Sequence, residues 1–175
     1  MIGLKRGTVK LLKPKAIWKQ SFEREKVKLK KVFGKDLIDI QHIGSTAITG
    51  ISAKPIIDIG LTAPFLERAK KYIPKLKKIG YNLKIEDRKD RLFFTKGTAK
   101  KRTHYLHIGE VGSDYIEGMV LFRNYLNRNK ATSKEYAELK DKLAKQYPEE
   151  RYIYAAKKKE FIESIVKKLK GDITS

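Results

Sequence analysis

Residues 38–62 read IDIQHIGSTAITGISAKPIIDIGLT, and the prediction of the fold begins with them. Ile38 and Ile40 alternate with polar neighbours, which is the pattern of a half-buried strand, and they lead into Gly44-Ser45. Residues 55–61 then form an apolar run that only Asp58 interrupts, as expected for a strand buried on both faces of a sheet. The stretch therefore predicts a strand, a glycine turn and a second strand that carries one carboxylate.

Two features of this stretch point to chemistry on phosphates. Backbone N–H groups and hydroxyls at Gly44, Ser45 and Thr46 suit a phosphate held at a strand end. A carboxylate such as Asp58 is costly to bury unless it is paired, hydrogen-bonded or bound to metal. Nucleotidyltransferase-type folds combine a Gly-Ser turn for the triphosphate with carboxylates on the next strand for divalent metal. Here the residue two positions beyond Asp58, on the same face, is Gly60, so one carboxylate of the usual pair is missing.

The rest of the chain alternates helix and strand signals before it becomes helical. Hydrophobic periodicity predicts helices at 14–33, 64–78 and 149–170 and strands at 81–86, 91–96 and 103–109. Gly34 is expected to end the first helix and Pro74 to break the second. From Tyr115 onward the chain is predicted to be helical, with Ser133 as the cap of a second helix in this region.

These signals predict an α/β (α+β) fold, with a mixed sheet flanked by helices and a C-terminal helical bundle. We expect a single domain over residues 1–175, in which about 1–112 form the α/β part and about 113–175 the helical part. The strands at 91–96 and 103–109 are expected to be antiparallel. On the second of them, alternation places Tyr105 and His107 on one face and His104 on the other.

Composition bounds the class of protein. The 175 residues are 41% hydrophobic, which is enough for a core, and the absence of cysteine excludes disulfides and thiolate metal sites. No apolar segment approaches the roughly 18 residues that span a bilayer, so a soluble cytoplasmic protein is expected. Forty-one Lys and Arg against twenty Asp and Glu give a net charge of +21, which favours RNA or another polyanion as partner. The alternative is a surface bias, because most lysines are interleaved with apolar residues at helical spacing.

Several separated motifs resemble the GrpB family, also called UPF0157. They are, in chain order, HIGSTAITGISAKPIIDI, RTHYLHI and LFRNYLNRN, and the resemblance covers about Lys15 to Val166. It implies similarity to the nucleotidyltransferase superfold, but no agreed reaction. This chain departs from the family pattern at Thr49, where Pro is usual, at Asn124, where Asp is usual, and at Tyr105, where a histidine is frequent.

The motifs predict which residues form the functional site. Asp58 is the expected ligand of Mg²⁺ and, with His107, a catalytic residue; the alternative for Asp58 is a purely structural buried carboxylate. His42 is expected to contact phosphate, and for both histidines the alternative is a buried imidazole bonded to the backbone. Lys54 is expected to bind phosphate. Arg123, unusual on an apolar helix face, is expected either to do the same or to pair with Asp58.

Two functions from different classes follow. The first is a nucleotidyltransferase-like protein that binds a nucleotide or other phosphorylated small molecule through Gly44, Ser45, Thr46, Lys54 and Arg123, with Mg²⁺-dependent nucleotidyl transfer as the candidate reaction. The second is a non-catalytic nucleic-acid or phosphate-binding module that uses the basic surface. A further carboxylate could complete a metal site, and the candidates are Glu86, Asp87, Asp90 and Glu110.

Overall fold

The computed structural model describes residues 1–85 and 89–173, and this part of the chain forms a five-stranded mixed sheet with six α-helices. The strands are β1 (Asp39–Ile43), β2 (Ile57–Ala63), β3 (Tyr81–Lys84), β4 (Leu92–Gly97) and β5 (Arg102–Glu110). The helices are α1 (Ala16–Phe33), α2 (Leu66–Lys70), α3 (Ile73–Lys78), α4 (Asp114–Arg128), α5 (Lys130–Gln146) and α6 (Arg151–Ile173). The strand order is β1-β2-β5-β4-β3, and β2 pairs with β5 in parallel while the other neighbours described are antiparallel. The predicted α/β fold with C-terminal helices is confirmed.

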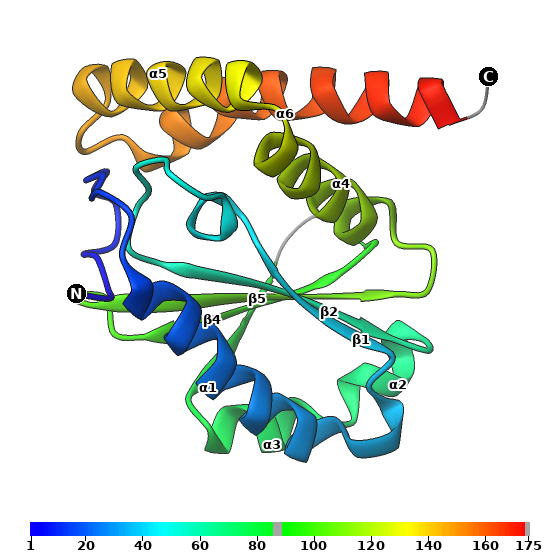
Figure 1. The fold of residues 1–175 in the computed structure, drawn as a ribbon. Coiled ribbons are helices and arrows are strands. Elements are labelled where there is room, and N and C mark those ends of the chain that lie inside the picture. Colours follow the sequence, from blue (N-terminus) through cyan, green and yellow to red (C-terminus); the bar gives the residue numbers. More distant parts are fainter. Residues whose placement is uncertain (86–88, 174–175) are drawn as a thin grey trace.

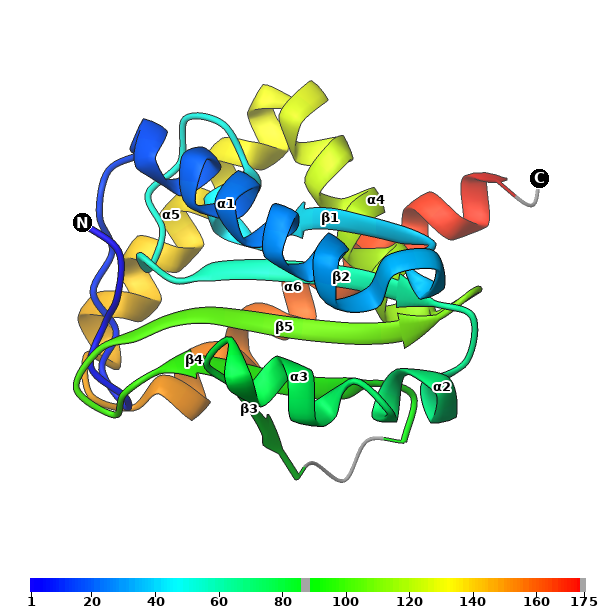
Figure 2. The same cartoon turned by 90° about the horizontal axis from the view of Figure 1, so that it is seen from below.

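Helices cover both faces of the sheet in two groups. Figure 1 shows α1, α2 and α3 on one face and α4, α5 and α6 on the other. Seen from below in Figure 2, α1 crosses β1 and β2 while α3 lies nearer β4 and β3. The central stretch thus runs through the middle layer, and its second strand, β2, has helices above and below it, as its apolar run predicted.

Alternation along β2 and β5 gives the two faces different characters. Ile57, Ile59 and Leu106 are fully buried in the cluster that α1 closes with Trp18, Phe22 and Leu29. In the register of the parallel pair, Asp58 lies opposite Tyr105 and Gly60 opposite His107. These residues face the α4–α6 side. The predicted separation of His107 from His104 is confirmed, because His104 contacts Ser21 of α1 through a 3.2 Å hydrogen bond.

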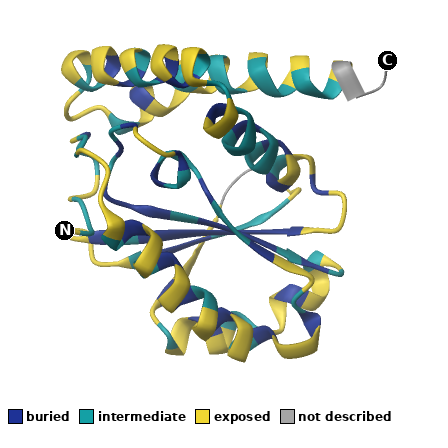
Figure 3. Ribbon diagram, in the orientation of Figure 1, coloured by how far each residue is buried: buried dark blue, intermediate teal, exposed yellow. Residues whose placement is uncertain are grey.

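Residues are most buried in the sheet and most exposed on the outer sides of the helices. In Figure 3 the inner strands β2 and β5 are dark blue along most of their length, whereas the outer sides of the helices are yellow. A second apolar cluster joins the C-terminal helices, with Phe122, Leu126 and Tyr136 at its centre and Phe161 packed against it. Within the described ranges, no helix is both long and apolar enough to cross a membrane.

Element boundaries agree with most sequence signals and correct two. Gly34, at φ 52°, follows α1, as its position after Phe33 predicted. The expected break at Pro74 is confirmed, because α2 and α3 are separate helices and Pro74 lies in the first turn of α3. The helix does not begin at Pro64, since Phe65 is extended and α2 begins at Leu66.

The prediction that Ser133 caps the second C-terminal helix is wrong. Helix α5 begins at Lys130, and the Asn129 side chain accepts a 3.0 Å hydrogen bond from the Thr132 N–H. Asn129 is the single residue between α4 and α5. Ser133 therefore lies inside α5 and not at its start.

Two neighbouring glycines let α4 approach the sheet closely. A Cβ built on Gly109 would lie 2.8 Å from Ile116 of α4 and 2.5 Å from the Ser113 hydroxyl. A Cβ on Gly60 would lie 3.3 Å from Ile43 and 3.4 Å from Ile116. The N-terminal end of α4 therefore lies directly on the sheet at these positions, while α6 lies farther along and leaves space beneath it.

Candidate functional site

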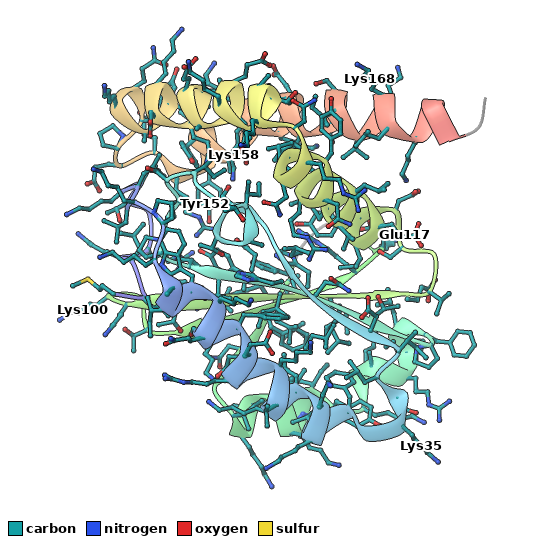
Figure 4. All side chains as sticks on the ribbon, viewed as in Figure 1. Lys35, Lys100, Glu117, Tyr152, Lys158 and Lys168 are labelled. Carbon is teal, nitrogen blue, oxygen red and sulfur yellow. The ribbon has the colours of Figure 1, made fainter. Side chains whose placement is uncertain are left out.

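A cavity of about 810 Å³ lies between the sheet and the C-terminal helices. Its floor comes from strand residues on the face of Asp58, and its other walls come from the Gly44-Ser45 turn, α4 and α6. The lining that matters here comprises Gly44, Ser45, Thr46, Lys54, Asp58, Arg91, Phe93, Tyr105, His107, Tyr115, Tyr136, Arg151, Tyr154 and Lys158. In Figure 4 the labelled Lys158 and Tyr152 lie between α6 and the sheet, whereas Lys168 points away from the outer side of the same helix.

Asp58 and Gly44 are in direct contact. Gly44 has φ 70°, and a Cβ built on it would lie 2.6 Å from Asp58 Oδ2 and 2.9 Å from its Cβ. A glycine is therefore needed here for both its backbone conformation and its lack of a side chain. The turn begins the short 3₁₀ segment Ser45–Ala47, so the backbone next to the carboxylate opens toward the cavity.

His107 lies between a cation and the Asp58 carboxylate. Arg91 Nη1 lies 2.8 Å from His107 Nδ1, and because a guanidinium only donates, Nδ1 accepts this hydrogen bond. The proton of the neutral ring is then on Nε2, which lies 3.7 Å from Asp58 Oδ1. Arg91 also stacks on the cavity wall, 4.0 Å from the centre of the Tyr115 ring. The row Arg91–His107–Asp58 fixes the imidazole tautomer and directs an N–H at the carboxylate.

Three cations line the same cavity without a carboxylate bonded to them. Among the described residues, Lys54, Arg151 and Lys158 form no salt bridge, and their charged ends lie over aromatic rings. Burial first, and then the charges of Lys158 and Arg151, lower the pKa of Lys54 to about 7, against a small opposing effect of Asp58. Burial also acts to lower the pKa of Lys158, but Tyr136, Tyr154 and Asp58 outweigh it and raise that pKa above the ordinary lysine range. Lys158 therefore keeps its proton, and Lys54 is the amine that loses one.

Aromatic rings make up much of the remaining wall. Phe93 stacks on His107 with 4.8 Å between ring centres, and Lys54 Nζ lies 5.3 Å from the centre of the Tyr154 ring. The Ser45 hydroxyl lies 3.3 Å from the Tyr136 hydroxyl, which ties the glycine turn to α5. The cavity thus combines flat apolar surfaces with positive charge, a combination suited to an aromatic ligand that carries an anion.

Two sequence-predicted site residues lie outside this cavity. His42 stacks on Phe22 of α1 with 4.8 Å between ring centres, and its Nε2 lies 2.9 Å from the Thr46 hydroxyl. In the β1–β2 register His42 pairs with Ile59, so it points to the opposite face from Asp58. Burial lowers the pKa of His42 to about 4 and keeps it neutral. His42 is thus half-buried, and its partner is a hydroxyl rather than the backbone.

Arg123 fastens α4 to the edge strand instead of entering the cavity. Its Nη1 donates to the His42 carbonyl at 2.6 Å and to Gln41 Oε1 at 3.0 Å. Its Nε and Nη2 donate to Asn124 Oδ1. The alternative pairing of Arg123 with Asp58 is not observed. The guanidinium bonds to a backbone carbonyl of the exposed edge of the sheet, and this accounts for an arginine at the position.

The residues present do not fit a Mg²⁺ site. Within residues 1–85 and 89–173, no group of three or more His, Cys, Asp or Glu side chains could hold a metal ion. The position of the second carboxylate is Gly60, and the space beside it is filled by Ile43 and Ile116. Asp58 Oδ1 faces the Nε2–H of His107, and a protonated ring nitrogen cannot be a metal ligand. Of the further carboxylates considered, Glu110 accepts from the Leu66 N–H at 3.3 Å and Asp90 does not line the cavity, while Glu86 and Asp87 lie outside the described residues.

Residues 8–168 match the family described as GrpB protein. The chain belongs to the GrpB family. The Glutamate-rich protein GrpB of Alkalihalophilus pseudofirmus is 37% identical over 174 residues, which cover 97% of this chain and 100% of that protein. The crystal structure of conserved protein GrpB from Enterococcus faecalis matches with a TM-score of 0.81 at 30% identity, over 91% of this chain and 99% of that chain. The resemblance expected from the motifs is confirmed.

The fold is also shared with a nucleotidyltransferase. A crystal structure of the Cid1 poly(U) polymerase matches 76% of this GrpB chain and 44% of the Cid1 chain, with a TM-score of 0.53 and 15% identity. An identity this low shows the fold alone. The nucleotidyltransferase-like architecture predicted for this GrpB protein is thereby confirmed, and the reaction is not.

Sequence reasoning missed the residues that α6 contributes. Arg151 and Lys158 reach the cavity from a helix about a hundred positions beyond Asp58, and no local pattern joins them to β2.

Proposed function

We propose that this GrpB protein binds a nucleotide or another small phosphorylated molecule in the cavity beneath α6, without the need for a divalent metal. The observation that carries the proposal is the group Lys54, Arg151 and Lys158. These groups lie in one partly enclosed space and have no bonded carboxylate among the described residues, so the charges of Arg151 and Lys158, and that of Lys54 when it is protonated, are left for a ligand to neutralise.

Size and wall chemistry support a small ligand. About 810 Å³ lies within the range typical of small-molecule sites. The phosphate group would lie near the Gly44-Ser45-Thr46 turn, where backbone N–H groups and two hydroxyls add to the positive charge. An aromatic base would lie against Phe93, Tyr105 or Tyr154. Some Cid1 structures that share this fold are bound to MgATP or MgGTP, which supports the ligand class but not a reaction.

The nucleic-acid alternative finds less support at the cavity. Lys159, Lys167 and Lys170 follow one another along the cavity edge on α6, which could track a polyanion. Two of the three are already paired, because Lys159 lies 3.3 Å from Glu163 and Lys170 forms an ion pair with Asp114. The unpaired positive charge along this edge is therefore small compared with that of Lys54, Arg151 and Lys158 deeper in the cavity.

A thermal-shift screen tests the proposal. The panel holds nucleoside mono-, di- and triphosphates, sugar phosphates, inorganic phosphate and pyrophosphate, each in EDTA and in Mg²⁺. A ligand that binds only the folded protein raises the melting temperature by mass action. We expect at least one phosphorylated compound to do so in EDTA. If no compound raises the melting temperature, and RNA raises it in a salt-sensitive way, the nucleic-acid alternative replaces this function.

A further inference from the structure

The amine of Lys54 differs from other lysine amines in its surroundings. It reaches the cavity from the segment just before β2, and its Nζ lies beside the Tyr154 ring. No carboxylate forms a salt bridge with it in the part of the chain that the structure describes. Arg151 and Lys158 line the same cavity. An amine placed among other cations and away from water is driven toward its neutral form.

Neutrality gives the amine a lone pair at ordinary pH. Burial first, and then the charges of Lys158 and Arg151, lower the pKa of Lys54 to about 7, so roughly half of the amine is unprotonated at pH 7. Burial lowers the pKa of Lys140 to about 7 as well. Lys140, however, donates to the Ser52 carbonyl and does not line the cavity. Of these two lysines, only Lys54 presents its amine to a ligand.

We propose that Lys54 is a nucleophile that forms an imine with an aldehyde or ketone carrying a phosphate group. This inference rests on the proposed function, because Arg151 and Lys158 would hold the phosphate beside the amine. A lysine desolvated next to other cations is a recurrent nucleophile toward carbonyl compounds. The aromatic wall at Tyr154 and Phe93 favours a flat, conjugated carbonyl compound over an aliphatic one.

The step balances without an oxidant or a reductant. The Lys54 lone pair attacks the carbonyl carbon, a C–N bond forms, and the π pair of the C=O bond moves to oxygen. That oxygen then leaves as water with the two hydrogens of the amine, and the C=N bond forms. Asp58 is the carboxylate whose charge acts on Lys54, and it is suited to take and return the proton. The protonated imine would carry a positive charge that Asp58 offsets.

Pyridoxal 5′-phosphate is the probe, because it is an aromatic aldehyde that carries a phosphate and its imines absorb visible light. The full chain is incubated with less than one equivalent of the probe, reduced with borohydride, digested and mapped by mass spectrometry. Pyridoxal, which lacks the phosphate, is run in parallel. At pH 7.5 we expect Lys54 to be labelled at least about tenfold more than the exposed Lys157. We also expect pyridoxal to label Lys54 at least about tenfold more slowly, through loss of the charged contacts.

Variants and competition keep the outcomes distinct. Lys54→Arg keeps the positive charge and removes the nucleophile, so it should lose the visible absorbance and the selective label; Lys157→Arg is the matched control and should keep both. Pyrophosphate should protect Lys54 in the wild type. Labels spread evenly over exposed lysines, while the wild type still binds pyrophosphate, would overturn the imine and leave the proposed function standing. Equal labelling by pyridoxal and its phosphate would overturn the phosphate-bearing substrate class.

Discussion

Asp58 occupies the space that a side chain at Gly44 would need, with Oδ2 2.6 Å from the position of a Cβ on that residue. The contact joins the two halves of the central stretch, since the turn ends β1 and the carboxylate begins the cavity face of β2. The carboxylate packs against Gly44 on one side and faces His107 on the other. Its position is therefore set before any ligand binds.

Gly44→Ala is predicted to destabilise the fold more than a matched glycine substitution does. Gly50 also has a positive φ, 83°, but nothing lies within 4 Å of a Cβ built there. Both substitutions carry the cost of a positive φ, about 1–3 kcal/mol, and Gly44→Ala adds an overpacking cost of about 1–3 kcal/mol. Urea unfolding of the two variants measures the difference. Equal losses of unfolding free energy would mean that the Asp58 contact is not tight.

Asp58→Asn is predicted to strengthen the binding of an anionic ligand. The substitution keeps the shape against Gly44 and removes a negative charge near Lys54 and Lys158. At pH 6, removing such a charge should increase affinity by roughly three- to tenfold. Isothermal titration calorimetry with pyrophosphate in EDTA gives the value. If Asp58 instead holds Mg²⁺, the same variant should bind more weakly in Mg²⁺, and this opposite sign separates the two roles.

Binding is predicted to weaken as pH rises above 7. The pKa of Lys54 is about 7 in the free protein, and an anion bound beside it would raise that pKa in the complex. Below pH 7 the amine is already protonated and contributes fully. Above pH 7 each binding event must take up a proton, so affinity falls by up to about tenfold per pH unit. Calorimetry at pH 8 in two buffers of different ionisation enthalpy should show the proton uptake, and Lys54→Arg should abolish it.

Stability is predicted to fall as the pH drops from 6.5 to 4. Burial lowers the pKa values of His42 and His104 to about 4, so between these limits the unfolded chain binds more protons than the folded one. Each histidine contributes a slope of at most about 1.4 kcal/mol per pH unit. Urea unfolding at successive pH values measures the slope. His104→Gln should reduce it by about half; an unchanged slope would show that His104 titrates normally in the fold.

The sequence was informative wherever one residue's neighbours decide its orientation. The period of two on β5 correctly separated His107 from His104, and the apolar run around Asp58 correctly identified β2 as a central strand. The Gly44-Ser45 turn was located by its residue types, because a glycine followed by a serine at the end of a strand is typical of a turn. Each of these inferences depends on interactions within about ten residues of chain.

The placements that the sequence did not reveal depend on pairing across the chain. His42 precedes Gly44 by two residues, yet the register that pairs it with Ile59 turns it to the α1 face. Arg123 has the charge for a phosphate, but α4 docks so that it reaches the edge of β1. The cations of α6 reach the cavity only because that helix packs over the sheet. Register and helix docking are tertiary properties that one sequence does not display.

The most direct test is calorimetric binding of pyrophosphate and ATP in EDTA to wild type, Lys158→Gln and Lys168→Gln. Both lysines lie on α6, but Lys158 lines the cavity and Lys168 points away from it. We predict binding to the wild type without metal, a loss of about tenfold or more in Lys158→Gln, and an unchanged affinity in Lys168→Gln. Equal losses in the two variants, or binding that appears only when Mg²⁺ is added, would contradict a metal-independent anion site beneath α6.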